Sequence, residues 1–188
     1  MDFIIMPQYL HANPKREITR GTLDAFWNSN AEEWVKFLFI YLYHTGARIS
    51  EALAVKAEDF DTITRDGEKF VLIYSLTLKN PSTHQRTLHI SLDEPYMAEL
   101  VGYSKFVKEG RLFKVSRQWA WVKLQEVIPW VTPHGFRHNR LNQFAQDGET
   151  AFALKSWAGW SSVAPSDSYT QSVDTLKMAQ RRRKRDKT

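Results

Sequence analysis

An apolar run over residues 34–43 constrains the fold of this chain more than any other stretch of its sequence. Lys36 is the only charged residue in the run, and two glutamates precede it. Carboxylates in the first turn of a helix are stabilised by the helix dipole, and a helix that is apolar on every side has to be surrounded by other elements. The sequence therefore predicts a buried helix from Ala31 to Tyr43, which Gly46 ends in a left-handed conformation.

The middle of the chain has the pattern of extended structure. Residues 61–64, 70–78 and 86–92 alternate in polarity or are rich in branched and aromatic side chains. Turn residues separate these stretches at Asp66-Gly67 and at Asn80-Pro81-Ser82. We therefore expect a small three-stranded antiparallel sheet.

Helical spacing, caps and stop residues predict that the rest of the chain is helical. Thr22, Ser50 and Ser116 are candidate helix caps, and residues 159–168 read as a loop that leads into Tyr169. The fold class is thus α+β, a mainly helical domain with one small sheet. The further helices are expected over residues 23–27, 48–53, 95–106, 117–127, 133–147, 150–158 and 173–180.

Composition excludes several classes of protein. Without cysteine there are no disulfides and no thiolate metal sites. The histidines at 84, 89, 134 and 138 lack the spacing of metal ligands, so we expect no metal and no cofactor. The apolar run over residues 34–43 is too short for a membrane span, and no secretory signal opens the chain. The sequence predicts a soluble, cytoplasmic protein, or a nuclear one in a eukaryote.

The basic character of the chain lies at its end. Residues 181–187 hold six basic residues and one acidic residue, which account for the whole net charge of +5. The remaining 20 basic and 20 acidic residues balance, so a DNA-binding face on the body requires local clustering. The tail, with Arg181, Arg182 and Arg183, is compatible with a phosphate-binding arm, a localisation signal or a solvated end.

A histidine and an arginine lie three positions apart at the start of one predicted helix. Pro133 can occupy the first helical position, and His134 and Arg137 then share a helix face. Such a pair can grip a phosphodiester and manage its protons if further cations lie nearby. On its own the pair is equally compatible with a solvated helix start.

Five segments, in this order along the chain, resemble the motifs of the catalytic domain of the tyrosine recombinase (phage integrase) family. Each motif is modest alone, but their order and spacing are specific. Thr45–Leu53 resembles the first-arginine motif, Lys79 the β-hairpin lysine, His134–His138 the H-x-x-R motif, Gly159–Ser162 the glycine-histidine-or-tryptophan motif, and Tyr169, nine positions after Trp160, the nucleophile.

The resemblance implies a DNA breaking-rejoining fold and a set of catalytic roles. Arg48 and Arg137 would hold the scissile phosphate, because a guanidinium is always charged and can engage two oxygens. Tyr169 would attack phosphorus and form a 3′-phosphotyrosyl link, while His134 manages its proton. The set of catalytic residues is Arg48, Lys79, His134, Arg137, Trp160 and Tyr169.

Other residues receive supporting roles from the resemblance. Lys79 would protonate the leaving 5′-oxygen, although it also fits an edge-strand lysine and Lys69 lies nearby. Trp160 would hold the phosphate or pack the tyrosine segment, and Glu51 would orient the arginine motif. The DNA contacts are expected from Arg86, His138, which is alternatively a structural residue, and the tail residues Arg181, Arg182 and Arg183.

The domain organisation follows from the same resemblance. We expect a lead-in segment over residues 1–20, the catalytic domain over 21–180 and a basic tail over 181–188, with the usual N-terminal core-binding domain absent. The partners are double-stranded DNA and other copies of the chain, which would form a dimer or tetramer on DNA through the C-terminal segment. The expected activity is metal- and ATP-independent recombination or integration of DNA. A silent DNA-binding relative and a type IB topoisomerase-like enzyme are the alternatives.

Overall fold

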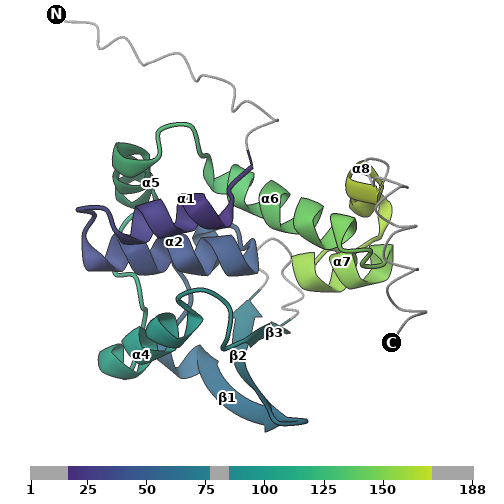
Figure 1. The fold of residues 1–188 in the computed structure, drawn as a ribbon, viewed down its shortest axis with the longest axis horizontal. Coiled ribbons are helices and arrows are strands. Elements are labelled where there is room, and N and C mark those ends of the chain that lie inside the picture. Colours follow the sequence, from purple (N-terminus) through teal and green to yellow (C-terminus); the bar gives the residue numbers. More distant parts are fainter. Residues whose placement is uncertain (1–16, 77–84, 171–188) are drawn as a thin grey trace, which may run out of the picture.

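The computed structural model describes residues 17–76 and 85–170, which form a helical layer with a small sheet at one end (Figure 1). This arrangement confirms the predicted fold class. The described elements are α1 (Arg20–Trp27), α2 (Glu33–Thr45), α3 (Ile49–Ala52), the 3₁₀ turn η1 (Ala57–Asp59), β1 (Phe60–Arg65), β2 (Glu68–Leu76), β3 (Gln85–Ser91), α4 (Met97–Val107), α5 (Arg117–Val127), α6 (Pro133–Gln146), α7 (Ala151–Ala158), η2 (Ala164–Ser166) and α8 (Asp167–Thr170).

Helix α2 lies at the centre of the core, as its apolar sequence predicts. It packs against α1, α4, α5 and α6, and all of its residues from Phe37 to Thr45 are buried. Phe39 stacks on Phe26 of α1 with ring centroids 4.0 Å apart and meets Phe136 of α6 edge-on at 4.9 Å. Gly46 ends the helix with φ of +59°. One helix thereby fixes the positions of four others.

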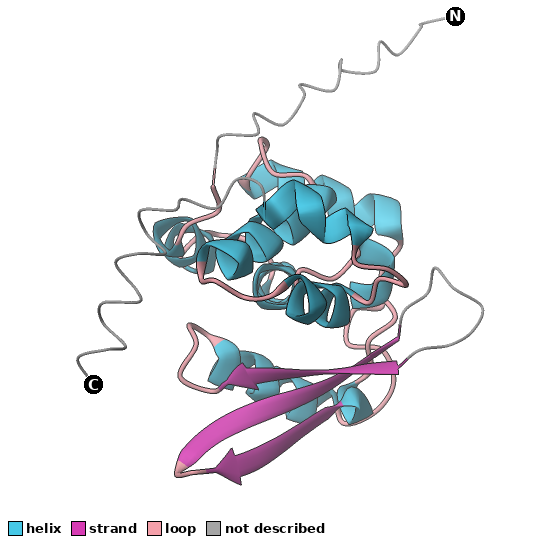
Figure 2. Ribbon diagram, turned by 90° about the vertical axis from the view of Figure 1, so that its right-hand side faces the viewer, coloured by secondary structure: helices cyan, strands magenta, loops and turns pink. Residues whose placement is uncertain are grey.

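The sheet has the order β1-β2-β3 and is antiparallel throughout. The predicted turn at Asp66-Gly67 is confirmed, since both residues have positive φ, as a two-residue hairpin requires. Val71, Ile73, Leu88 and Ile90 are buried in the same core as α2 and α4. Figure 2 shows the sheet and α4 together below the main helical layer.

The structure corrects two predicted caps and one loop. Thr19 caps α1, because its hydroxyl accepts the N–H of Thr22 and its own N–H donates to the hydroxyl of Thr22. The capping residue of α3 is Arg48 rather than Ser50, because the Glu51 carboxylate accepts the Arg48 N–H. Tyr169 lies on the one-turn helix α8 and not in a loop. The predicted turn at 80–82 and the helix over 173–180 lie outside the described residues.

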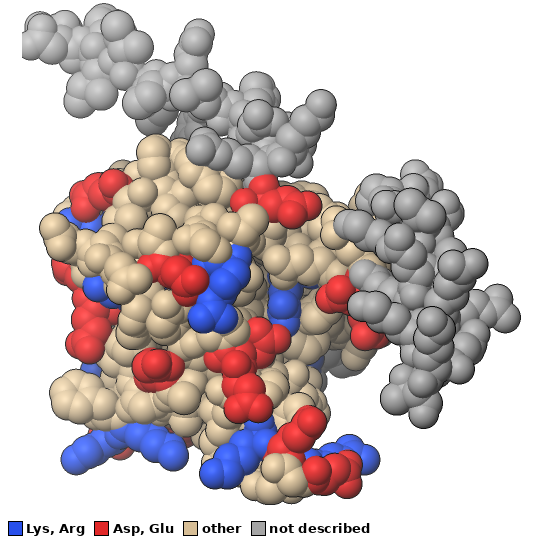
Figure 3. Space-filling view, viewed as in Figure 1, with Lys and Arg blue, Asp and Glu red and all other residues tan. Residues whose placement is uncertain are grey.

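The surface of the described domain carries both signs of charge. Basic and acidic side chains are interspersed on the face shown in Figure 3, in keeping with the balanced charge of the body of the chain. Within residues 17–76 and 85–170 no helix is long and apolar enough to cross a membrane.

His44, in the last turn of α2, is a fully buried histidine. Its Nε2 lies 2.8 Å from the carbonyl oxygen of Pro95, and its Nδ1 lies 3.8 Å from a carboxylate oxygen of Glu94. Burial lowers the pKa of His44 from 6.5 to about 4. The ring is therefore neutral near pH 7, and Nε2 donates a hydrogen bond to Pro95 rather than the ring forming an ion pair with Glu94.

We expect His44 to make the stability of the domain depend on pH. Below pH 6.5 the unfolded chain binds a proton at this ring that the folded protein does not bind, so stability falls as the pH drops towards 4. The loss is about 2 kcal/mol between about pH 7.5 and pH 5. Urea unfolding should show a flatter pH dependence for His44→Gln, whereas His89→Gln, at an exposed position of β3, keeps the wild-type dependence. Parallel curves for wild type and His44→Gln would contradict this account.

Candidate active site

The corner between α2 and α3 is where the first predicted motif meets α6. The Thr45 hydroxyl donates to the carbonyl of Tyr41 and accepts the N–H of Ala47. A β-carbon on Gly46 would lie 3.1 Å from Cβ of Arg140 and 3.6 Å from Cα of Arg137. Glycine is thus required both by the positive φ and by the close approach of α6. The approach brings Arg137 beside the backbone that leads into Arg48.

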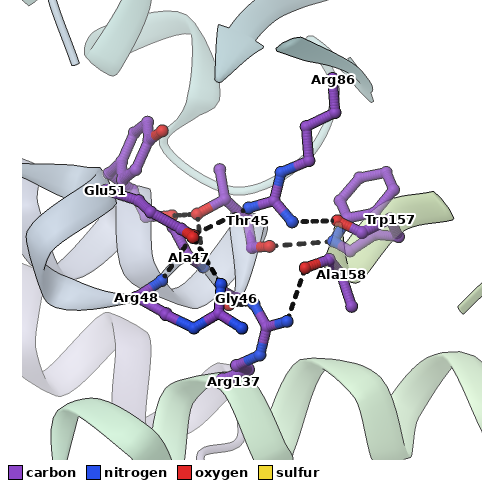
Figure 4. A network of polar contacts seen from close by, with 10 residues as sticks. Thr45, Gly46, Ala47, Arg48, Glu51, Arg86, Arg137, Trp157 and Ala158 are labelled. Carbon is purple, nitrogen blue, oxygen red and sulfur yellow. Dashed lines mark hydrogen bonds and ion pairs between the residues drawn. The ribbon is translucent and has the colours of Figure 1, made fainter. Parts of the chain in front are cut away.

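Glu51 connects the arginines of the site (Figure 4). Its side chain is completely buried. One carboxylate oxygen accepts Nη1 of Arg48 at 2.6 Å, and the other accepts the Arg48 backbone N–H at 3.0 Å and Nη2 of Arg86 at 3.1 Å. The Arg48 side chain remains 28% exposed, so its guanidinium is bound to Glu51 and is still accessible to solvent.

Arg86 differs from its predicted role as a DNA contact. Its side chain is only 7% exposed. Besides the bond to Glu51, its Nη1 donates to the carbonyl of Trp157 at 2.5 Å. Burial lowers the pKa of Arg86, while Glu51 opposes that shift. In this structure Arg86 joins β3 to the end of α7 instead of presenting its charge at the surface.

Arg137 projects from α6 towards the ends of two other helices. Its Nη1 donates to the carbonyl of Gly46 at 3.2 Å and its Nη2 to the carbonyl of Ala158 at 2.6 Å. The guanidinium also lies 5.6 Å from the centre of the Trp160 ring. Burial, followed by the charges of Arg48 and Arg86, lowers the pKa of Arg137 to about 10. Arg137 is therefore a fixed cation at neutral pH.

Tyr169 is brought to the same site by α8. Its ring stacks on Trp160 with centroids 5.8 Å apart, and its hydroxyl lies 2.8 Å from Nδ1 of His138. The residue is 6% exposed and packs with buried residues of α6 and α7. Burial raises the pKa of the Tyr169 phenol, and Arg137 opposes this shift. The phenol is thus protonated near pH 7 and is paired with a histidine.

His134 and His138 lie one turn apart on α6. Their rings meet edge-on with centroids 4.3 Å apart. Burial lowers the pKa of both rings, and Arg137 and Arg48 lower that of His134 further. For His138 the second cause is His134 and the third is Arg137. Crowding of cationic groups thus favours the neutral imidazoles.

The structure brings together most of the residues that the sequence singles out. A continuous series of contacts runs from His134 through His138, Tyr169 and Trp160 to Arg137. Arg48 lies beside Arg137 (Figure 4). Sequence reasoning missed the contact of His138 with Tyr169, which the i, i+4 spacing from His134 could have indicated. Lys79 and the tail residues Arg181, Arg182 and Arg183 lie outside the described residues.

The side chains at this site are of the kinds that an anion-binding centre with a nucleophile would need. In the described part of the chain, no three histidine, aspartate or glutamate side chains group as metal ligands would, and the one carboxylate at the site, Glu51, is engaged by two arginines. Two guanidinium groups beside a phenol and two imidazoles can hold a phosphate and exchange protons with it.

The comparisons with known proteins agree with this chemistry. No protein-family model matches the chain. The tyrosine recombinase XerD of Mycobacterium tuberculosis is 29% identical to it over 142 residues, which are 69% of this chain and 45% of XerD. The chain therefore spans a little under half the length of this curated relative.

Solved structures show the same fold. The XerH site-specific recombinase bound to its difH substrate superposes with a TM-score of 0.62 at 17% identity, over 84% of this chain and 49% of XerH. The catalytic domain of bacteriophage HP1 integrase superposes with a TM-score of 0.57 at 22% identity, over 88% of this chain and 93% of that domain. The chain is thus similar in sequence to a tyrosine recombinase, and it has the fold of the catalytic domains in these solved structures.

Proposed function

We propose that this chain is the catalytic domain of a site-specific DNA recombinase or integrase, which cleaves and rejoins DNA through a 3′-phosphotyrosyl intermediate. One observation carries the proposal. Arg48, Arg137 and Tyr169, which lie on three separate segments of the chain, meet at one site with histidines between them. The similarity to tyrosine recombinases agrees with this proposal, and the structure of XerH bound to its difH substrate supports double-stranded DNA as the partner.

The two arginines bind and stabilise the reacting phosphate in this proposal. Negative charge grows on the non-bridging oxygens as the nucleophile attacks, and fixed guanidinium groups offset it without reorganisation. Arg137 is held on two carbonyls and Arg48 on Glu51. Both charges are therefore positioned before DNA arrives, and Trp160 packs beside them against Tyr169.

Tyr169 supplies the nucleophile. A bond forms between its phenolic oxygen and phosphorus as the bond from phosphorus to the 5′-oxygen breaks, and the leaving oxygen takes a proton that we assign to Lys79. The phosphotyrosyl bond conserves the energy of the broken phosphodiester, so religation needs neither metal nor ATP. His134, whose pKa is lowered by burial and then by the charges of Arg137 and Arg48, contributes to holding the phosphate and to proton transfer.

The partners follow from the same proposal. The protein acts on duplex DNA, with Arg181, Arg182 and Arg183 as further phosphate contacts that make binding sensitive to salt. The segment after Tyr169 is proposed to dock on a neighbouring copy, giving a dimer or tetramer on DNA. The protein would accordingly be found associated with DNA in the cell.

We expect Tyr169 to form a covalent adduct with DNA. A pool of nicked duplexes with a randomised region loses the short strand after cleavage, so the adduct accumulates and survives SDS. Wild type should give a protease-sensitive adduct and enrich particular sequences, and Tyr169→Phe should give none, because a phenyl ring has no nucleophilic oxygen. Tyr74→Phe, on β2 and outside the site, is the matched control and should behave as wild type.

The other outcomes of this experiment identify the alternatives. Sequence-specific binding without any adduct would indicate a silent DNA-binding protein and would contradict the proposal. Relaxation of a supercoiled plasmid that lacks the enriched sequence would indicate a topoisomerase-like enzyme.

We expect Glu51→Gln to destabilise the domain and reduce cleavage together. The change leaves Arg48 and Arg86 without their carboxylate, and an unpaired buried charge costs about 3 kcal/mol of unfolding free energy. Glu126→Gln is the control, because its carboxylate is 53% exposed and pairs with Lys123 at the surface, where a pair contributes less than about 1 kcal/mol. Urea unfolding and the adduct assay measure both effects. Equal stability of Glu51→Gln and wild type would show that the arginines do not depend on this carboxylate.

A further inference from the structure

The hydrogen bond between Tyr169 and His138 points to a catalytic role that the family motifs do not give to His138. We propose that His138 is the group that accepts the phenolic proton of Tyr169 as the tyrosine attacks phosphorus. This inference rests on the proposed function, and it assigns the proton acceptor to a different histidine from His134.

The geometry of the contact suits direct proton transfer. Oη of Tyr169 and Nδ1 of His138 are 2.8 Å apart, within the range over which a general base acts on its substrate proton. The two rings are tilted by 32° with centroids 5.5 Å apart, so the phenol approaches the edge of the imidazole that carries the nitrogen. His134 instead meets the ring of His138 edge-on.

The protonation state of the pair sets the direction of the hydrogen bond. Burial and the neighbouring His134 and Arg137 lower the pKa of His138, and burial raises that of Tyr169. A neutral imidazole has one ring nitrogen that donates and one that accepts. In our proposal the phenol donates to Nδ1, which assigns the proton of the neutral His138 ring to Nε2. The nucleophile is thus hydrogen-bonded to its proposed base before DNA binds.

Bound DNA would make His138 a stronger base at the moment it is needed. After burial, the groups that disfavour its protonation are His134 and Arg137, and Arg137 is proposed to hold the phosphate together with Arg48. A phosphodiester between these groups carries negative charge that offsets theirs, so protonation of His138 becomes more favourable. The structure therefore couples phosphate binding to activation of the tyrosine.

The step balances as follows. The Oη–P bond forms while the P–O5′ bond breaks, and the electron pair of the broken bond goes to the 5′-oxygen. The Tyr169 proton moves to Nδ1 of His138, and the 5′-oxygen takes a separate proton from the donor assigned above to Lys79. In religation the 5′-hydroxyl attacks phosphorus and gives its proton back to the group assigned to Lys79, while the P–Oη bond breaks and His138 returns its proton to the departing phenolate.

A substrate with sulfur in place of the bridging 5′-oxygen distinguishes the removal of the phenolic proton from the protonation of the leaving group. A thiolate leaves without being protonated, so the substrate repairs defects in the leaving-group donor and not defects in the base. We expect His138→Asn, whose amide can still hydrogen-bond to Oη, to cleave this substrate about 100-fold more slowly than wild type at pH 7. The deficit should shrink as the pH rises, because hydroxide then removes the phenolic proton. Lys79→Ala should cleave it at nearly the wild-type rate.

The outcomes distinguish this inference from the proposed function. Wild type that forms no adduct on either substrate overturns the proposed function, and the inference with it. Wild type that cleaves, together with a His138→Asn variant within about threefold of its rate, overturns the role of His138 alone. If His134→Asn instead cleaves the sulfur substrate slowly at pH 7 and recovers as the pH rises, the base is His134.

A measurement without activity tests the resting contact even if His138→Asn folds poorly. Two-dimensional proton–nitrogen spectra of the histidine side chains report which ring nitrogen carries the proton. We expect His138 of the wild-type protein to be protonated on Nε2, with the Nδ1 signal shifting in Tyr169→Phe because its hydrogen-bond donor is gone. A proton on Nδ1 in the wild type would contradict the inference.

Discussion

The buried carboxylate of Glu51 determines whether the arginines of the site can coexist. Moving a charged group out of water costs several kcal/mol unless a partner compensates it, and Arg48, Arg86 and Arg137 crowd into one region. Glu51 offsets two of these charges directly. Its position one turn after Arg48 also fixes the start of α3. The local backbone, the sheet and the cationic site thus share one acidic group.

Much of the fold follows from local sequence. The apolar helix α2, its end at Gly46 and the Asp66-Gly67 hairpin each depend on residues close together in the chain. The start of α6 is equally local, since Thr132 accepts the N–H of Gly135 and Pro133 fills the first turn. The predicted position of the α1 cap, Thr22, was wrong by about one turn, because Thr19 and Thr22 have the same side chain and both take part in the capping box.

The site was predictable in its residues but not in its contacts. The order of the motifs indicated a resemblance to tyrosine recombinases, yet Arg86 lies in a strand pattern that does not distinguish a surface residue from a buried one. Its environment depends on Glu51 and on the end of α7, 35 and 71 positions away. The pairing of Tyr169 with His138 likewise depends on α8 packing against α6. Such contacts are set by the whole fold and not by spacing along the chain.

Arg137 also donates hydrogen bonds to the C-terminal ends of two helices. Gly46 is the C-cap of α2 and Ala158 is the last residue of α7, so the guanidinium satisfies carbonyls at two negative helix ends. Two further hydrogen bonds join the same helix ends. Arg86 donates to the carbonyl of Trp157, and the indole N–H of Trp157 donates to the carbonyl of Thr45. The side chain that we propose to bind the phosphate therefore also holds the ends of α2 and α7 together. Replacing Arg137 by a shorter cation would remove the donor from both helix-end carbonyls, which ties the proposed chemistry of the site to the architecture of the domain.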